Sequence, residues 1–445
     1  MKAKNDKKTI WAWCMFDWAN QSYNMVITST IFPAYYVAIT ANEKNGNMVS
    51  FFGHKYVNTV LQNYILGLSY LLIVVSLPIL TSIADYRGNK KKYLQFFTWI
   101  GSLACAGLFF LEPDKPIEFG MICFGIASIG YCGGFVFYNS YLPQIATLDK
   151  QNDVSAKGFI YGFLGSIVSQ LICFAVVLSP KIMPKTFGGV DDALLARISF
   201  LIVCAWWLGF SLIPFKILPK GEPNAGSHKF NVFTGGFKEL AKVFGKIKTM
   251  PLVKRFLPAF FFYSVGVQTI MLVAAEFAAK ELHMKDDDLI TIILVIQVVA
   301  IFGAWLTSIA SNKYGNTRAL IVLVVFWTIT CSCLYFITNQ TQFYMAAFAV
   351  GLVMGGVQSL SRSTYAKLLP QNIPDTASFF SFYDATEKLS IVVGLFTFAV
   401  VEDWTHEMRD SALTLDGFFI IGLLLLIVLH IVERKTPVQV EVAMA

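Results

Sequence analysis

Apolar residues in this chain come in twelve long runs, separated by short segments rich in charged residues, glycine and proline. Each run is close to or above the ~20 residues that an α-helix needs to cross a bilayer. Lipid offers no hydrogen-bond partner to an exposed backbone, so these runs predict transmembrane helices. The predicted spans lie near residues 14–40, 58–83, 93–111, 117–142, 158–179, 196–218, 252–281, 288–310, 319–338, 342–362, 378–401 and 413–432.

A short basic loop occurs twice, after the second and after the eighth predicted span. Its copies are Asp85-Tyr86-Arg87-Gly88-Asn89-Lys90-Lys91 and Asn312-Lys313-Tyr314-Gly315-Asn316-Thr317-Arg318, which share a Gly-Asn pair and a terminal cation. Gly133-Gly134 in the fourth span and Gly355-Gly356 in the tenth form a second pair of corresponding features. Corresponding features half a chain apart indicate duplicated halves, an architecture that in membrane proteins is typical of transporters.

The repeat predicts three parts of the chain. These are a first six-helix bundle over residues 1–218, a cytoplasmic linker over 219–250 and a second six-helix bundle over 251–445. In the linker, apolar residues recur at helical spacing with lysines between them, which predicts an amphipathic helix on the membrane surface. A docking site for a regulatory partner is the alternative. The apolar residues are Phe233, Phe237, Leu240, Phe244 and Ile247.

Composition and charge change the picture little, because they too indicate a membrane protein. Apolar residues make up 56% of the chain and charged residues 14%, a balance that soluble globular proteins rarely have. With both termini in the cytoplasm, most of the 35 Lys and Arg residues fall on the inner side, as the positive-inside rule requires. This distribution accounts for the net charge of +7 without a nucleic-acid partner. The basic segment 1–8 precedes a span that contains Asp17, so we expect a retained first helix rather than a signal peptide.

The sequence carries no pattern that indicates an enzyme, a cofactor or a metal site. The eight cysteines lie in or beside apolar runs without metal-ligand spacing, and the five histidines are scattered. A phosphate-binding glycine loop and a nucleophile elbow are both missing from the sequence. We therefore expect no enzymatic activity, no cofactor and no metal, with the cysteines as small buried apolar residues.

The first basic loop resembles the signature loop between the second and third helices of the major facilitator superfamily, with Tyr86 and Asn89 where that pattern has cations. Further motifs resemble the vacuole-effluxer-like branch of the superfamily, the autophagy-related amino-acid effluxers. They are Phe16-Asp17-Trp18-Ala19-Asn20-Gln21-Ser22-Tyr23, Phe137-Tyr138-Asn139-Ser140-Tyr141-Leu142-Pro143, Gly355-Gly356-Val357-Gln358-Ser359-Leu360-Ser361-Arg362-Ser363 and the span 379–394 with Lys388. The resemblance covers nearly the whole chain. It implies an all-α polytopic membrane protein with twelve transmembrane helices in two six-helix bundles, and for the fungal members it implies amino-acid export from the vacuole.

The signature loop is a candidate gate, because transporters of this kind alternate access by rocking two helical bundles around a central site. Asp85 can accept hydrogen bonds from a neighbouring helix end or a cation and so hold one state shut, and Gly88 belongs to the same loop. Arg362, near the inner end of the tenth span, is a structural or gating cation rather than a binding residue. We expect the lysines at 90–92 only to fix the topology and to contact lipid phosphates.

The eleventh span contains the densest group of ionisable residues. Asp384 and Lys388 are four residues apart and share one helix face. One interpretation is a self-contained pair that only stabilises the span. The other is functional, because charges inside a membrane usually face a cavity or a partner: Lys388 then lies against an anionic substrate group or a coupling carboxylate.

The first span carries a polar stripe formed by Asp17, Asn20 and Gln21, which share a helix face. We expect this stripe to line water or substrate. Asp17 is a candidate proton carrier. The alternative is that Asp17 caps or pairs structurally at the cytoplasmic boundary.

Four more polar residues in apolar spans are candidates. Glu276, in the outer half of the seventh span, is a proton site or a group that reaches the outer interface. Asn139, Gln268 and Gln358 are candidates for hydrogen bonds to substrate. Their alternative role is to join helices to one another.

Together these features predict a proton-driven secondary active transporter of a small polar solute, an amino acid being one candidate. The alternatives are an uncoupled facilitator and a transporter-derived solute sensor or scaffold. The expected partners are the solute, protons and the lipid bilayer, with no nucleic acid, and the expected state is a monomer. We expect a multi-pass protein of the bacterial cytoplasmic membrane with both termini in the cytoplasm.

Overall fold

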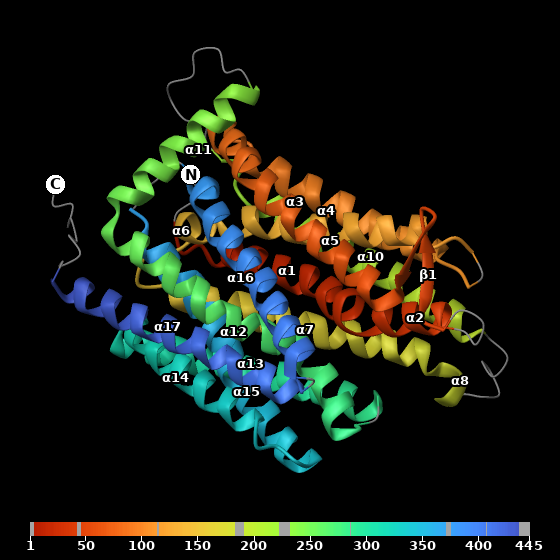
Figure 1. Cartoon of the computed structure of the whole chain (residues 1–445). Helices are drawn as coiled ribbons and strands as arrows, with labels where there is room; N and C mark the ends of the chain where they lie inside the picture. Colours follow the sequence, from red (N-terminus) through yellow and green to blue (C-terminus); the bar gives the residue numbers. More distant parts are fainter. Residues whose placement is uncertain are drawn as a thin grey trace. The chain divides into compact units, whose positions relative to one another are not determined.

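The computed structural model describes residues 4–41, 46–113, 115–182, 191–221, 232–284, 286–370, 375–405 and 407–435. Side chains are described for the same residues except 181–182, 232–240, 275–276, 279–280 and 286–287. Helices account for almost all of the described chain (Figure 1). The exception is one short hairpin, in which β1 (Met48–Phe51) pairs antiparallel with β2 (His54–Val57). An all-α polytopic architecture is the one that the apolar runs predicted.

The chain forms two compact units, each of which is described here by itself. Unit 1 contains Met1–Lys150, Lys157–Leu240 and Asn372–Lys388, and unit 2 contains Gln151–Ala156, Ala241–Gln371 and Leu389–Ala445. Two short segments therefore group with the other half of the sequence. The division of the chain at residues 218 and 251 stays a prediction.

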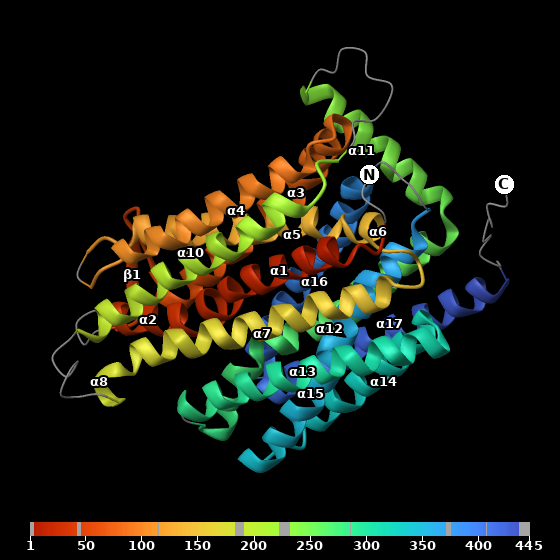
Figure 2. The same cartoon turned by 180° about the vertical axis from the view of Figure 1, so that it is seen from behind.

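Unit 1 is built around long helices from the first half of the sequence. Helix α1 packs against α10, and α4 against α5 (Figure 2). The elements are α1 (Lys7–Ser22), the π-helix η1 (Tyr23–Thr30), α2 (Ile31–Thr40), α3 (Asn58–Arg87), α4 (Lys90–Gly107), the 3₁₀-helix η2 (Leu108–Phe110), α5 (Glu118–Asn139), α6 (Leu142–Ile145), α7 (Gln151–Val177) from residue 157, α8 (Ser179–Ile182) and α10 (Asp192–Ile217).

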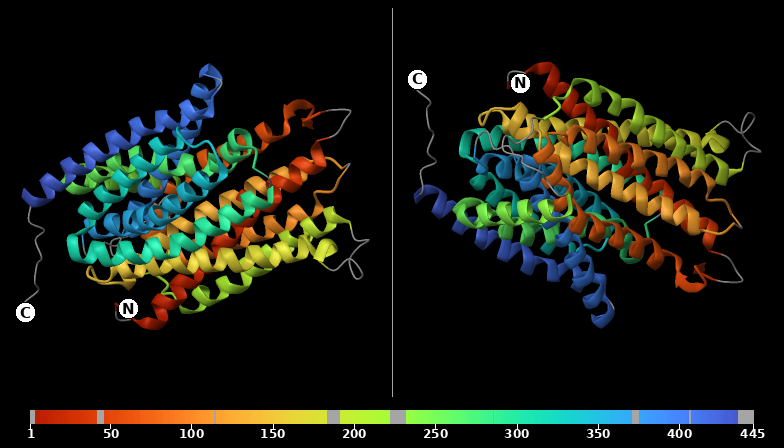
Figure 3. Two further views of the ribbon diagram at one scale, coloured as in Figure 1. Left: turned by 90° about the horizontal axis from the view of Figure 1, so that it is seen from below. Right: turned by 90° about the horizontal axis from the view of Figure 1, so that it is seen from above.

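Unit 2 is built from the second half. Helix α13 packs along α15, and α12 along α17 (Figure 3). The elements are α12 (Pro251–Leu282), α13 (Asp286–Tyr314), α14 (Asn316–Leu334), α15 (Gln340–Leu368) and α17 (Met408–Lys435). Helix α16 (Thr376–Thr405) contributes its first half to unit 1 and its second half to unit 2.

Ten of the described helices are long and apolar enough to cross a membrane. The two predicted spans missing from this set, near 14–40 and 378–401, both have a polar interior. The first is divided into α1, η1 and α2, and the second corresponds to α16, which carries Asp384, Glu387 and Lys388. Charge and broken helical geometry inside a membrane protein usually mark function rather than stability.

The π-helix in the first span has a local cause. Pro33 has no N–H and its ring crowds the preceding turn, which disfavours regular α-helical bonds just before it. The hydroxyls of Ser29 and Thr30 each donate to the carbonyl five residues back, at Asn24 and Met25. The π-helix η1 begins at Tyr23, directly after the polar stripe of α1.

Glycines allow the closest helix crossings in both units. In unit 1, a Cβ on Gly130 would meet the backbone of Gly101, so α4 and α5 approach through two residues without side chains. In unit 2, a Cβ on Gly303 would meet the carbonyl of Leu352, so α13 lies directly on the backbone of α15. Small residues at such crossings are the usual basis of helix packing in membranes.

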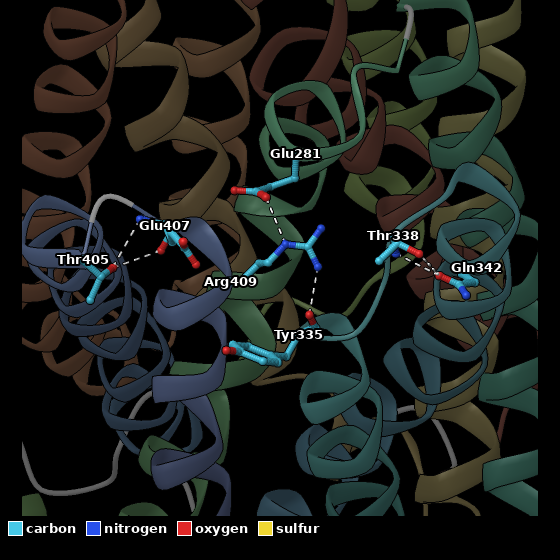
Figure 4. Close-up of polar contacts among 7 residues, drawn as sticks. All are labelled: Glu281, Tyr335, Thr338, Gln342, Thr405, Glu407 and Arg409. Atoms are coloured by element: carbon cyan, nitrogen blue, oxygen red, sulfur yellow. Dashed lines mark hydrogen bonds and ion pairs between the residues drawn. The ribbon is translucent and has the colours of Figure 1, made fainter.

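One end of unit 2 is tied together by Arg409 at the start of α17 (Figure 4). Its Nε lies 3.0 Å from the Glu281 carboxylate of α12, and its Nη1 donates to the carbonyl of Tyr335 at 2.8 Å. In the connection from α14 to α15, the backbone N–H of Thr338 donates to the side chain of Gln342 at 2.8 Å. These contacts fix helix ends that are otherwise joined by short loops.

The helix predicted in the linker is present as α11 (Val232–Thr249). Its residues up to 240 group with unit 1, and the rest group with unit 2. Val243 and Ile247 are buried, whereas Phe244 is 47% exposed and carries the Lys248 ammonium over its ring. The other apolar positions, Phe233, Phe237 and Leu240, lie outside the described side chains. The location of α11 on a membrane surface stays a prediction.

Candidate functional site

Asp17 lies inside unit 1 on the third turn of α1, and its side chain is fully buried. The N-cap of α1 is Asp6, so Asp17 does not cap the helix. The Tyr138 hydroxyl of α5 donates to the Asp17 carboxylate at 2.5 Å. Tyr138 is itself fixed, because its ring stacks on Trp13 and its carbonyl accepts from the Trp13 indole N–H at 3.0 Å. The carboxylate is therefore held by a preorganised donor.

The polar stripe of α1 continues at Gln21, one turn further along. The Tyr131 hydroxyl of α5 donates to the Gln21 side-chain oxygen at 3.3 Å. Between these two positions lies Asn20, which is fully buried and makes no side-chain hydrogen bond within the described part of the chain. An unsatisfied buried amide is costly, so such groups in native proteins call for an explanation.

Lys388 lies on the first half of α16, and its side chain is 13% exposed. Its ammonium lies 3.3 Å from the Glu387 carboxylate and 5.4 Å above the ring centroid of Tyr70 from α3. It also interacts electrostatically with Tyr131 and Cys132 of α5. A membrane-buried ammonium is thus surrounded by one carboxylate and an aromatic wall, an arrangement that stabilises its charge.

Asp384 has a different partner. The Asn139 amide of α5 donates to the Asp384 carboxylate at 3.2 Å, and both side chains are buried. The carboxylate within ion-pair distance of Lys388 is Glu387, which the sequence analysis did not single out. Asp384 and Lys388 lie on the same side of α16 but contact different residues.

Helices α1, α3, α5 and α16 bring these side chains together in unit 1, and we refer to them as the polar cluster. Five of its members were candidates from the sequence, and the three tyrosines and Glu387 were not. The cluster consists of Asp17, Gln21, Tyr70, Tyr131, Tyr138, Asn139, Asp384, Glu387 and Lys388.

Asp85 contacts the first turn of α16, and it is almost fully buried. Its carboxylate accepts from the backbone N–H of Ala377 at 3.2 Å and of Ser378 at 2.7 Å, and from the Ser378 hydroxyl at 2.8 Å. The first N–H groups of a helix have no partner inside the helix and favour negative charge. Gly88 ends α3 in the left-handed conformation, at φ 62°, which glycine adopts without strain.

The lysines of this loop do more than fix topology. Lys90 is buried: its ammonium lies 4.5 Å above the Tyr141 ring and donates to the Thr376 hydroxyl at 3.3 Å. The Lys91 ammonium donates to the Leu218 carbonyl at 2.7 Å. The expectation that both only contact lipid phosphates is wrong, because each is used within unit 1 to hold a neighbouring segment.

The second copy of the loop holds the first turn of α7 within unit 2. The Asn312 amide donates to the Asp153 carboxylate at 2.6 Å and accepts from Asn152 at 2.9 Å. Arg362, which is fully buried, donates to the hydroxyl and the carbonyl of Ser155 at 3.0 and 2.8 Å. Each copy of the loop therefore binds the start of a helix, one through a carboxylate and one through an amide.

The remaining candidates belong to unit 2, and the polar cluster does not include them. Gln358 is half-buried, and its amide N–H group lies 3.6 Å from the Met271 sulfur. Gln268 is half-buried on α12. The side chain of Glu276, also on α12, lies outside the described residues.

The family model described as "Vacuole effluxer Atg22 like" matches residues 5–437. The chain belongs to this family. It is 30% identical to the uncharacterized MFS-type transporter YxiO of Bacillus subtilis (strain 168), with 97% of this chain and 96% of that protein covered. It is 26% identical to autophagy-related protein 22 of Yarrowia lipolytica, with 85% of this chain and 77% of that protein covered.

Solved structures of major facilitator transporters share the fold. The fucose transporter FucP in its outward conformation aligns with a TM-score of 0.67 at 12% identity, over 94% of this chain and 98% of that chain. The proton:xylose symporter XylE aligns with a TM-score of 0.67 at 11% identity, over 94% of each chain. The predicted family and the all-α major facilitator fold are confirmed. The protein is an integral multi-pass membrane transporter.

Proposed function

We propose that the protein is a secondary active transporter that moves a small polar solute by alternating access and is coupled to protons. The observation that carries this proposal is the polar cluster of unit 1. Its ionisable side chains lie in helices that are otherwise apolar, where charge is costly and usually belongs to a transport pathway. Its members come from four helices, as a site for a solute requires.

The solute that fits best carries both an anionic and a cationic or hydrogen-bonding group. The Lys388 ammonium can bind a carboxylate of the solute in place of Glu387, since it has three N–H donors. The carboxylates of Asp384 and Asp17 favour an ammonium, and the buried Asn20 amide offers a donor and an acceptor. An amino acid meets these requirements, and the family description as effluxer supports export.

Proton coupling requires a carboxyl group that can be charged in one state and neutral in another. Asp17 suits this role because it is buried, and a proton removes its charge while a carboxyl oxygen can still accept from Tyr138. Asp384 and Glu387 are the further carriers in the cluster. Glu276 of α12 is a second location for the same function.

Alternating access needs contacts that hold in one state and release in another. We assign this role to Asp85 with Gly88 at the start of α16 and to Arg362 at the start of α7. Asp85 accepts hydrogen bonds from the first turn of α16, and Arg362 donates hydrogen bonds to Ser155 near the start of α7. Release of such charge-assisted hydrogen bonds costs a few kcal/mol rather than tens. Such contacts are strong enough to bias two states and weak enough to break during transport.

Counterflow in proteoliposomes tests the proposal. Liposomes with reconstituted protein and loaded with a candidate amino acid should exchange it for labelled amino acid outside, and a pH gradient should drive net accumulation. Lys388→Gln should abolish exchange, and Asp17→Asn should retain exchange but lose accumulation. Lys157→Gln and Asp192→Asn are matched controls, because both side chains are exposed on α7 and α10.

Each outcome has a distinct meaning. Exchange without accumulation in the parent indicates an uncoupled facilitator, and binding without exchange indicates a sensor or scaffold. If Lys388→Gln and Asp17→Asn both behave like the controls, the polar cluster is not the transport site.

We also propose that both termini are cytoplasmic, that the protein works as a monomer and that it resides in a bacterial cytoplasmic membrane. The support for the cytoplasmic termini is the excess of Lys and Arg in the loops on one side of the predicted spans. A reporter that is active only in the cytoplasm should be active when fused to either terminus. Activity at one terminus only would contradict an even number of spans.

A further inference from the structure

A groove of mixed character lies between α12 and α17 in unit 2. Its free space is about 530 Å³, a volume that includes its open mouth, and it is lined by Lys254, Arg255, Pro258, Leu425 and Val428. The two cations come from the first turns of α12, and the apolar side chains come from both helices. The groove therefore has a cationic end and an apolar wall.

The two cations have no carboxylate partner within the described residues. Lys254 is exposed. Arg255 uses one N–H group to donate to the Pro251 carbonyl at 2.9 Å, which leaves further donors of the guanidinium available. Arg409, at the other end of α17, is by contrast paired with Glu281. Adjacent cations repel each other, so an anion between them is favourable.

The apolar wall continues into the membrane. Pro258 belongs to the predicted span of α12, and Leu425 and Val428 belong to that of α17. Val428 is 47% exposed. A soluble anion would satisfy only the cationic end of the groove, whereas a molecule with an anionic head and a hydrocarbon tail would satisfy both. Basic pockets between transmembrane helices on the cytoplasmic side are known to accept anionic lipid head groups.

Neighbouring segments strengthen the positive charge at this end of unit 2. Helix α11 ends only two residues before α12 begins and carries Lys248 over the exposed ring of Phe244. Helix α17 has Arg434 and Lys435 in its last turn, which together outnumber the one acid there, Glu433. Each basic residue near an anionic lipid surface adds attraction, so this end of unit 2 favours anionic over zwitterionic lipid.

We propose that the groove is a binding site for an anionic phospholipid. The phosphate lies between Lys254 and Arg255, and one acyl chain follows Leu425 and Val428 into the membrane. The site is independent of the polar cluster, so its failure would leave the proposed transport function untouched.

Native mass spectrometry of the purified full-length protein in detergent provides the test. The protein is titrated with phosphatidylglycerol and with phosphatidylcholine of the same acyl chains, and adducts are counted. Phosphatidylglycerol should bind more tightly. Loss of each cation should weaken this binding about fivefold, and the double variant Lys254→Gln/Arg255→Gln should weaken it about 30-fold. The matched control Lys157→Gln/Lys216→Gln removes two exposed cations of unit 1 and should leave the affinity unchanged.

Two further measurements separate the parts of the proposal. Val428→Trp fills the apolar wall without changing charge and should also weaken phosphatidylglycerol binding. Free glycerol 3-phosphate should not displace phosphatidylglycerol at concentrations at which phosphatidylglycerol itself saturates the groove. Equal affinity for the two lipids, unchanged binding in the double variant, or full competition by glycerol 3-phosphate would each overturn the proposal. If the double variant unfolds, the two single variants decide the question by their fivefold effects.

Discussion

The contact of Asp85 with α16 allows a prediction with a magnitude. Substitution Asp85→Asn keeps the size of the side chain, but it removes the charge and turns an amide N–H₂ toward the backbone donors of residues 377 and 378. Hydrogen bonds to a charged group contribute about 1.5–3 kcal/mol and neutral ones about 0.5–1.5 kcal/mol. With one oxygen left as acceptor, we expect a loss of about 2–4 kcal/mol in the free energy that holds the first turn of α16.

Hydrogen exchange followed by mass spectrometry measures this loss directly. Amide exchange in a native protein reports the free energy of local opening. A loss of about 2 kcal/mol corresponds to about 30-fold faster exchange at residues 376–382. Ser378→Ala removes only the hydroxyl contact and should accelerate exchange about fivefold. Asn312→Ala serves as the matched control, because it should accelerate exchange at residues 151–156 and leave 376–382 unchanged.

Lys90 adds a second part to this prediction. Its buried ammonium interacts electrostatically with Asp85, so Asp85→Asn leaves a buried cation with less compensation. The double variant Asp85→Asn/Lys90→Gln should therefore be less damaged than the sum of the two single variants. Exchange at 376–382 within twofold of the parent in Asp85→Asn would refute the reasoning as a whole.

Three further predictions concern other parts of the chain. Gly303→Ala should lower the thermal unfolding temperature in detergent, because its methyl group meets a backbone carbonyl of α15 and overpacking costs about 1–3 kcal/mol. Gly209→Ala, inside α10 with open space around it, should not lower that temperature, because alanine favours a helix over glycine. Tyr138→Phe removes the hydrogen bond to Asp17 and should shift the pH profile of transport in proteoliposomes, and an unchanged profile would contradict a proton role for Asp17. Lys115 and then Arg197 hold the pKa of Glu112 below its usual range, so the stability that these ion pairs contribute should be lost as pH falls through that lowered pKa. Glu112→Gln should remove this part of the acid dependence of the unfolding temperature.

The sequence was sufficient for the helices and for the loop that identifies the superfamily. A long apolar run in a membrane has to be helical to pair its backbone groups, so twelve spans could be predicted from the sequence. Asp17 and Lys388 were also found in this way, because a charge inside an apolar run stands out. The family model over residues 5–437 confirms the identification that these motifs allowed.

The partners of those charges could not be predicted. Helical periodicity places Asp384 beside Lys388, but the contacts that decide the pairing come from Asn139 and Tyr70 on other helices. Glu387 escaped attention because adjacent residues on a helix do not share a face, and the long lysine side chain bends back to reach it. Residue spacing describes one helix at a time, whereas a site in a membrane protein is made of several.

The burial of Lys90 could not be predicted from the sequence either. A lysine next to a transmembrane span is usually a topology signal, and two more lysines follow it. Its burial depends on the ring of Tyr141 and the hydroxyl of Thr376, which are far from it in the sequence. Long-range contacts of this kind leave no local pattern.

The two copies of the loop differ in where the negative charge is located. At the first junction the acid is in the loop, as Asp85, and the helix contributes a hydroxyl at Ser378. At the second the acid is on the helix, as Asp153, and the loop contributes the Asn312 amide. The acid thus lies in the loop at the first junction and on the helix at the second, while at both a carboxylate accepts a hydrogen bond from a side chain. Divergence after duplication can therefore move the acid of a loop to the helix that the loop contacts, so the second loop keeps the Gly-Asn pair while its acid has to be sought on α7.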